Sequence, residues 1–391
     1  MIVAAAVGAI LLASVTLYAV LGGADFGGGL WDLLAGGDRR GAAPRQFIDE
    51  SITPVWEANH VWLVFDLVIF WTAFPHAFAA VMLTLALPLW LAAGGIVLRG
   101  AGFAFRKETR ALGMQRAAGA VFAFSSLLTP FFMGTVVGAI ASGQVPAQAT
   151  HASLAAWTGV IPLMTGFLFT SACGFLAGVY LSWEAARSGN QQMQVYFARR
   201  AQAAALVTGA LSLAALLELN YLDPTLFGRL TGRALPLVII AGVCGLAAAG
   251  LLAAGRPAGI RVLAALGVAA VIWGWGVAQY PVLLPGTGMT LSNAGAPHAT
   301  LVAVVVLAII VVLLIGPSFA LLFALHGRHV LTGEHLHAAR PAGPALASPP
   351  PAPAGPAERP GAASRTVAIG LAATVALARV LAARRDRRTG R

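Results

Sequence analysis

Long apolar segments separated by short clusters of arginine dominate this sequence. An α-helix needs about 20 apolar residues to cross the hydrocarbon core of a bilayer. Nine segments meet this requirement, and they lie at residues 3–35, 52–74, 77–99, 118–142, 160–182, 198–220, 236–254, 258–280 and 300–325. They lack the alternation of apolar and polar residues that strands of membrane barrels show. The pattern therefore predicts an all-α polytopic membrane protein with about nine transmembrane helices.

Composition and charge agree with this prediction. Of the 391 residues, 59% are hydrophobic and only 10% are charged, whereas soluble domains have about 25% charged residues. The net charge of +11 raises the question of a nucleic-acid partner. The arginines flank the apolar segments, however, and this is the distribution that the positive-inside rule describes. We therefore expect membrane lipids as neighbours and no nucleic acid as partner.

The basic residues also predict the orientation of the chain. They gather in the connections after the first, third, fifth and seventh segments, as Arg39, Arg40, Arg45, Arg99, Arg106, Lys107, Arg110, Arg116, Arg187, Arg199, Arg200, Arg256 and Arg261. The other connections carry only Arg229 and Arg233. The alternation predicts a bacterial inner-membrane protein with its N-terminus outside and its C-terminus in the cytoplasm. The first 20 residues have no positive n-region, so we expect them to stay as the first helix.

The sequence divides into three regions. Residues 1–330 form the expected transmembrane domain, and residues 331–365 are so rich in Pro and Ala that they read as a flexible cytoplasmic tail. Residues 366–391 are apolar and then basic. We expect an interfacial helix there, because a tenth span would export the terminal arginine cluster; an extra transmembrane helix is the alternative.

Three ionisable residues lie in or just before the second apolar segment. Glu57 and His60 share one helical face, and Asp66 lies about two turns further along. A carboxylate inside a membrane costs at least about 2.5–3.5 kcal/mol, so it marks a functional site by default, and chains of Asp, Glu and His are typical of proton relays. We interpret these residues as a candidate proton path; a polar contact that only holds helices together is the alternative. A di-iron site would need a second Glu-x-x-His copy, which the sequence lacks, so we expect no metal.

The first and third segments add further candidates. Asp25 lies in a glycine-rich stretch, where Gly23 and Gly27 allow a neighbouring helix to approach closely. Arg99 and Arg106 lie at the inner end of the third segment. One interpretation is that their charges reach the membrane surface along the apolar stems and set the topology. The alternative is a structural ion pair with an acidic side chain.

Taken together, these motifs resemble subunit II of the cytochrome bd-type quinol oxidases. The family pattern Tyr-x-x-x-Asp-Gly-Phe-Asp-x-Gly-x-Gly corresponds to Tyr18-Ala-Val-Leu-Gly-Gly-Ala-Asp-Phe-Gly-Gly-Gly29. The pattern Ser-Ile-x-Pro-x-Trp-Asp-x-Asn-x-x-Trp-Leu corresponds to Ser51-Ile-Thr-Pro-Val-Trp-Glu-Ala-Asn-His-Val-Trp-Leu63. Shorter matches follow in the family's order at Phe74-Pro75, Leu98-Arg-Gly100, Phe103-Ala-Phe-Arg106, Leu127-Leu-Thr-Pro130, Gln279-Tyr-Pro281 and Ala296-Pro297. The resemblance covers roughly residues 10–330.

The resemblance implies two four-helix bundles with a peripheral helix, and a heterodimer with a haem-bearing subunit I, which a small accessory subunit can accompany. The complex would oxidise quinol and reduce dioxygen to water. The three haems would lie in subunit I, while this chain would bind neither haem nor metal. It would contribute scaffold and a cytoplasm-facing proton path, a role that the family pattern carries over to Glu57, Asp25 and Trp56.

Two positions depart from the family pattern. Gly22 stands where the family has its first acidic residue, so a relay through two carboxylates of the first helix does not follow, and Glu57 replaces an Asp. His60 occupies a variable position. A proton-coupled secondary transporter is the alternative function, since intramembrane carboxylates also mark that class. A purely structural scaffold would leave Asp25 and Glu57 unexplained.

Overall fold

The computed structural model describes residues 2–108 and 112–327, except for the side chains of residues 38, 39, 52–58, 103, 106–108, 112–116, 315, 319, 320 and 322–327. The predicted regions 331–365 and 366–391 lie outside these residues. The chain divides into two units, residues 1–319 and 320–391, and the fold described below is that of the first.

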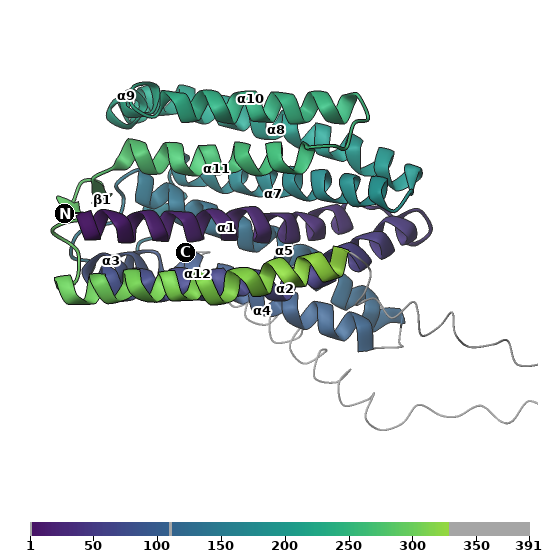
Figure 1. The fold of residues 1–391 in the computed structure, drawn as a ribbon, viewed down its shortest axis with the longest axis horizontal. Helices are drawn as coiled ribbons and strands as arrows, with labels where there is room; N and C mark the ends of the chain where they lie inside the picture. Colours follow the sequence, from purple (N-terminus) through teal and green to yellow (C-terminus); the bar gives the residue numbers. More distant parts are fainter. Residues whose placement is uncertain (1, 109–111, 328–391) are drawn as a thin grey trace, which may run out of the picture. The chain divides into compact units, whose positions relative to one another are not determined.

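The fold is helical, as predicted, with one short hairpin added (Figure 1). The helices are α1 (Ile2–Leu33), α2 (Asp38–Ala73), α3 (Pro75–Thr84), α4 (Ala86–Glu108), α5 (Leu112–Ala141), α6 (Ala155–Thr158), α7 (Val160–Arg187), α8 (Gln191–Leu222), α9 (Pro224–Thr231), α10 (Leu235–Ala253), α11 (Ile260–Gln279) and α12 (His298–Gly327). The antiparallel strands β1 (Val282–Leu284) and β2 (Met289–Thr290) form a hairpin between α11 and α12.

Among the described residues, seven helices are long and apolar enough to cross a membrane, and the bent pair α3–α4 makes eight. In α2 the apolar stretch found among these residues, Asn59–Ala73, is shorter than a full span. The predicted count of nine therefore stays a prediction. The polytopic helical class is confirmed.

The third predicted segment, residues 77–99, is not one continuous helix. It is broken between α3 and α4, whose axes differ by 83°. Pro88 explains the break, because proline has no N–H to donate to the carbonyl of Thr84 and its ring would clash with that carbonyl. The freed Thr84 carbonyl instead accepts a hydrogen bond from the backbone N–H of Ser153, at 2.9 Å.

The second predicted segment also begins too late. Helix α2 starts at Asp38, so it includes the polar residues that sequence analysis assigned to a connection. Within this first part, Ile48 is buried and Gln46 donates to Glu50 at 2.9 Å, one helical turn along. Amphipathic packing thus extends the helix beyond the apolar stretch.

Two groups of four helices make up most of the unit. In one, α1 packs on α2 and α5, and α4 packs on α5. In the other, α7 and α10 each pack on both α8 and α11. Helix α12 is peripheral and buries Leu301, Val304 and Ala308, of which the first two pack into the core with α2 and α3. Figure 1 shows α1 between the two groups, and it packs against α7 as well as α2 and α5.

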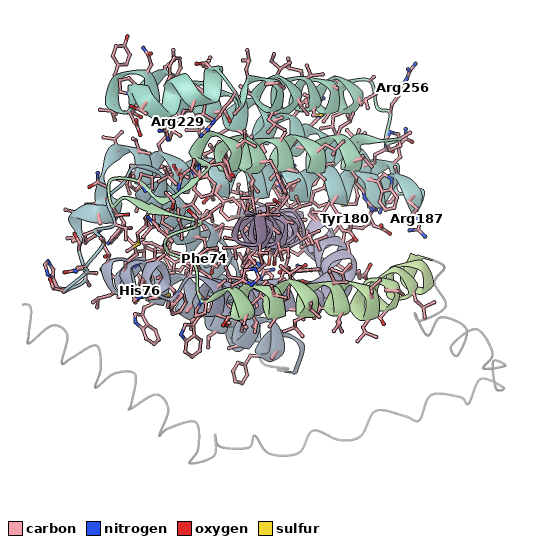
Figure 2. The ribbon with its side chains drawn as sticks, turned by 60° about the vertical axis from the view of Figure 1, so that its left-hand side comes forward. Phe74, His76, Tyr180, Arg187, Arg229 and Arg256 are labelled. Carbon is pink, nitrogen blue, oxygen red and sulfur yellow. The ribbon has the colours of Figure 1, made fainter. Side chains whose placement is uncertain are left out.

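The predicted alternation places charges from successive connections at opposite ends of the helices, with most basic residues at one end. Figure 2 shows Arg187 and Arg256 at one end, and Arg229 with His76 toward the other. The first two belong to predicted cytoplasmic connections and Arg229 to an external one. Which end faces the cytoplasm stays a prediction.

Close contact between α1 and α7 depends on Gly27. A Cβ atom there would overlap the carbonyl oxygen of Cys173 and lie 2.7 Å from the Cβ of Ala177. In Gly27→Ala, overpacking costs about 1–3 kcal/mol or more, which exceeds the gain of about 1 kcal/mol in helix propensity. We therefore expect a lower midpoint of thermal denaturation, measured as the loss of monodisperse protein after heating.

The matched control is Gly209→Ala in α8, where a Cβ would meet no atom within 4 Å. It should leave the midpoint unchanged or raise it. If both variants behave alike, the close contact at Gly27 does not limit stability.

Candidate functional site

An ion pair between α1 and α4 lies in the interior of the helical unit. The Nη2 atom of Arg99 is 2.5 Å from the Oδ1 atom of Asp25, and each side chain is only 1% exposed. Removing both charges from water costs several kcal/mol per ion, and their attraction offsets this only with good geometry and further hydrogen bonds. The surroundings of Arg99 supply both.

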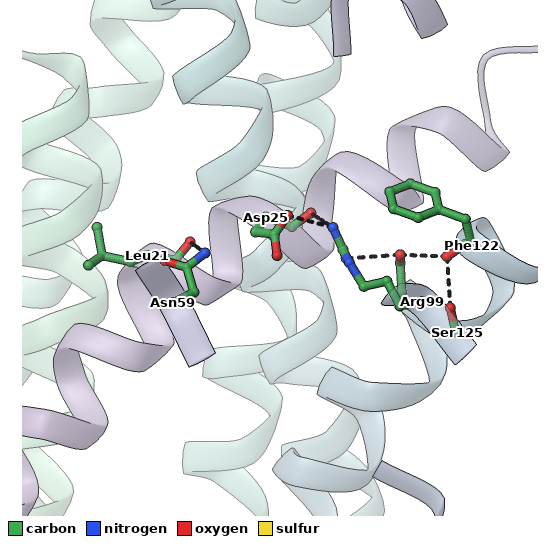
Figure 3. Close-up of polar contacts among 7 residues, drawn as sticks. Leu21, Asp25, Asn59, Arg99, Phe122 and Ser125 are labelled. Carbon is green, nitrogen blue, oxygen red and sulfur yellow. Dashed lines mark hydrogen bonds and ion pairs between the residues drawn. The ribbon is translucent and has the colours of Figure 1, made fainter. Parts of the chain in front are cut away.

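Helices α5 and α1 share the other contacts of the guanidinium group (Figure 3). Nη1 of Arg99 donates to the hydroxyl of Ser126 at 2.9 Å, and Nη2 also donates to the backbone carbonyl of Asp25 at 3.0 Å. The rings of Phe26 and Phe122 lie 5.0 and 4.7 Å from the guanidinium carbon, which is the range of cation–π contacts. Ser126 in turn donates to the carbonyl of Phe122 at 2.6 Å. The cation is thus held between an anion, a hydroxyl group and two ring faces.

Small residues bring the three helices close enough for this arrangement. A Cβ atom at Gly29 of α1 would overlap the Ser126 side chain, and one at Gly95 of α4 would overlap the hydroxyl of Thr129. One at Gly102 would lie 2.9 Å from the carbonyl oxygen of Ala118. Glycines thus allow α4 and α1 to approach α5.

Helix α2 borders the other side of Asp25. Asn59 is 1% exposed and donates to the carbonyl of Leu21 at 3.3 Å. Its side-chain amide lies beside the Asp25 carboxylate, and His60 is within electrostatic range of the same carboxylate. Of the candidates from sequence, Asp25, Arg99 and His60 therefore lie in one neighbourhood.

Asp66 lies further along α2, where it faces Ser14 of α1. Tyr18, one turn from Ser14, is within electrostatic range of both Asp66 and Asp25. The side chains of Glu57, Trp56 and Arg106 lie outside the described residues, although their backbones belong to α2 and α4.

Comparison with known proteins identifies the family. The family model for cytochrome bd terminal oxidase subunit II matches residues 3–326. This chain belongs to that family. A curated relative, cytochrome bd ubiquinol oxidase subunit 2 of Bacillus subtilis (strain 168), is 28% identical over 156 residues, or 39% of this chain. That match spans 45% of the relative, less than half of its length.

The solved structure of the bd oxidase from Geobacillus thermodenitrificans contains a chain with the same fold. It superposes with a TM-score of 0.67 over 83% of this chain and 99% of its own length, at 20% sequence identity. The helical arrangement described above is therefore that of a bd oxidase chain.

For this subunit II family member, sequence reasoning missed several members of the site. Ser126, Phe122 and Tyr18 were not predicted as site residues, although Tyr18 belongs to the first motif. A signal was available in α5, where Ser125, Ser126 and Thr129 place three hydroxyl groups inside an apolar segment. Asp32, by contrast, lies apart from the Asp25 site and pairs with Arg45 at 2.9 Å near the connection of α1 and α2.

Side chains of the metal-ligating types are scattered over the described part of this subunit II chain. No group of three or more His, Cys, Asp or Glu side chains occurs there that would hold a metal ion. His76, His151 and His298 are exposed near helix ends, and Cys173 and Cys244 are buried singly in different helices.

The buried pair generates a prediction about stability. Removing one partner of such a pair leaves an uncompensated charge and costs about 3–5 kcal/mol, whereas replacing both with apolar residues is often neutral. We therefore expect Arg99→Met and Asp25→Leu each to lower the thermal midpoint strongly. The double variant should recover much of the loss.

The measurement is a double-mutant cycle on the thermal midpoints of the purified protein, in which the coupling between neighbouring sites shows as non-additivity. A double variant whose loss equals the sum of the two single losses would contradict the pairing.

Proposed function

We propose that this chain is the non-haem subunit of a quinol:oxygen oxidoreductase. Together with a haem-bearing subunit I, it would couple quinol oxidation to the reduction of dioxygen to water in the respiratory chain of a bacterial membrane. Membership of the subunit II family and the shared fold support this proposal. The chain would bind subunit I and membrane lipids, and a small accessory subunit can complete the assembly.

The observation that carries the proposal for this chain's own role is the buried Asp25 carboxylate. Its Oδ1 is paired with Arg99, while its buried Oδ2 has no hydrogen-bond partner among the described residues. A carboxylate with one anchored and one available oxygen can take up and release a proton without leaving its position. A scaffold function alone gives no reason to bury such a group, because apolar residues stabilise a membrane bundle without the cost of desolvation.

In this proposal, protons enter from the cytoplasmic side and pass along the residues between α1 and α2. Glu57 and Asp25 carry the proton, with Trp56 beside Glu57 shielding or orienting its carboxyl group. His60 lies in electrostatic range of Asp25, and Asp66 lies further along the same interface. The N-terminus would face outside, which puts the inner end of α1, and with it Asp25, on the cytoplasmic half.

Gly22 is the position where this path departs from the family pattern. A Cβ atom at Gly22 would lie 3.4 Å from the ring of Tyr18 and 3.7 Å from the ring of Phe26. Two aromatic rings therefore flank the position of the missing family carboxylate. The path in this chain runs through one carboxylate of α1.

The test of the proposed function is gentle purification of the tagged chain from its native membrane. We expect a larger haem-bearing subunit to co-purify, haem bands in the reduced-minus-oxidised absorption spectrum, and quinol-dependent oxygen uptake. A folded, colourless preparation without such a partner would refute the proposal and favour a transporter.

A substitution tests the proton path separately. Asp25→Asn keeps an oxygen for the hydrogen bond to Arg99 but cannot carry a proton, and positioned proton transfer contributes at least about 100-fold to rate. We expect quinol-dependent oxygen uptake per haem to fall by about 100-fold, the lower part of that range. The thermal midpoint should also fall, because Asn leaves the charge of Arg99 without its anion. Glu57→Gln should likewise slow turnover while leaving assembly intact.

The matched control is Asp223→Asn. The Asp223 side chain caps α9 by accepting a hydrogen bond from the N–H of Leu226 at 3.0 Å, and Asn is an equally good cap. This variant should retain wild-type turnover. Unchanged uptake per haem in Asp25→Asn would contradict the proton path. Loss of the whole complex in Glu57→Gln would instead indicate that Glu57 is structural.

A further inference from the structure

The interface between α1 and α2 concentrates buried polar atoms that lack hydrogen-bond partners. Among the described residues, twelve buried side-chain atoms are without such a partner. Five of them belong to this one interface, namely Ser14 Oγ, Tyr18 OH, Asp25 Oδ2, Asn59 Oδ1 and Asp66 Oδ1. The Nε atom of Arg99, next to Asp25, is a sixth. Half of the unpartnered atoms thus gather at one place.

Helical periodicity puts the five side chains on facing surfaces. On α1, Ser14, Tyr18 and Asp25 follow one another after four and seven residues, so they share one face. On α2, Asn59 and Asp66 are seven residues apart and also share a face. The hydrogen bond from Asn59 to the Leu21 carbonyl shows that these two faces meet.

The two helices run antiparallel across this contact. Ser14 faces Asp66 at one end, and Asn59 lies beside Asp25 at the other. Tyr18 is within electrostatic range of both carboxylates. The polar strip on α1 from Ser14 to Asp25 is about 16 Å long at the usual helical rise.

Apolar and aromatic side chains enclose this strip. Tyr18 packs in a cluster with Phe26 and Cys173, and Trp62 and Leu63 of α2 pack against that cluster. The rings of Tyr18 and Phe26 meet edge to face, with 6.4 Å between their centroids. In such surroundings an unpaired polar atom costs free energy comparable to a lost hydrogen bond. Buried water typically makes two to four hydrogen bonds to polar groups that lack other partners. Several such groups lie close together in this strip, so the strip can bind water.

We propose that Ser14, Tyr18, Asn59, Asp66 and Asp25 line a water-binding seam between α1 and α2. The hydroxyl groups of Ser14 and Tyr18 can both donate to and accept from water, whereas the carboxylates and the amide oxygen of Asn59 accept. Water bridges between neighbouring side chains satisfy all five atoms, and a bridged pair is nearly as favourable as a direct hydrogen bond.

The seam also extends the proton path, and this part of the inference rests on the proposed function. A proton that enters the water chain at one carboxylate releases another proton at the far carboxylate, because each water or hydroxyl accepts one proton as it donates its own. No atom is consumed and no charge is left behind. Tyr18 then links Asp66 of α2 to Asp25 of α1. It lies on the helix in which Gly22 replaces the family carboxylate.

The first test is an electron cryo-microscopy structure of the purified complex at a resolution that shows ordered water. We expect water within hydrogen-bond distance of the Tyr18 hydroxyl, the Asp66 carboxylate and the Ser14 hydroxyl. A strip without water, in which these side chains bond directly to one another or to the partner subunit, would overturn the seam. This outcome does not depend on whether the complex oxidises quinol.

The second test removes one hydroxyl. Tyr18→Phe keeps the ring and its contact with Phe26, so it should leave haem content and thermal midpoint unchanged and lower turnover about tenfold or more. The matched control is Thr16→Val, since the Thr16 hydroxyl bonds within its own helix to the Leu12 carbonyl at 2.7 Å. Turnover in the control should stay within about twofold of wild type, as is usual for a change that breaks no shared contact.

The outcomes separate the claims. Water in the seam with unchanged turnover in Tyr18→Phe would overturn the proton link and keep the seam. A preparation without haem or quinol oxidation would refute the proposed function. The electron cryo-microscopy structure would still show whether water occupies the seam.

Discussion

The arrangement of α1, α4 and α5 depends on a buried cation that must be compensated from several sides. Arg99 is among the largest fully buried side chains of the described residues, and its charge cannot be lost by deprotonation at physiological pH. Asp25 neutralises it, Ser126 accepts one of its hydrogen bonds, and Phe26 and Phe122 present ring faces to it. These partners come from α1 and α5. Because a buried charge that loses one partner is costly, the three helices are held in one relative position.

Helix α1 can serve two groups of helices because its opposite faces differ. Gly23 and Gly27 are four residues apart and meet Cys173 of α7, while Asp25 and Tyr18 lie on another face toward α2 and α4. In a membrane, where lipid is as apolar as leucine, close van der Waals packing and internal hydrogen bonds drive association. The glycine face supplies the first of these and the polar face the second. The glycine-rich motif and the carboxylate it contains are therefore parts of one arrangement, in which dense packing on one face holds a charged group fixed on the other.

Sequence reasoning predicted the helical class and the positions of most helices, because the bilayer requires long apolar segments with basic residues at their ends. The ordered motifs predicted the family. It placed Asp25 and Arg99 among the candidates, since a charge within an apolar segment is unusual in itself. It did not predict the break between α3 and α4. That signal, Pro88, was present in the sequence but lies inside an apolar run that hydropathy reads as continuous. Ser126 could not be assigned to Arg99, because a hydroxyl group in a span has a bond available within its own helix, and only the packing of α5 on α1 and α4 selects the partner.

The neighbours of Gly22 give a physical reason for a glycine at this position. A side chain at this position would meet the rings of Tyr18 and Phe26, and a carboxylate placed against two rings would lose its water. Glycine avoids that cost, and the two rings meet edge to face. Across the interface, Asp66 of α2 faces Ser14 and lies within electrostatic range of Tyr18. Proton-transferring groups in a membrane need a chain of short steps and not a particular residue at each step, so a hydroxyl group and water can stand where a relative uses an acid. Such an exchange would keep the spacing of the polar groups while lowering the number of buried charges that α1 must compensate.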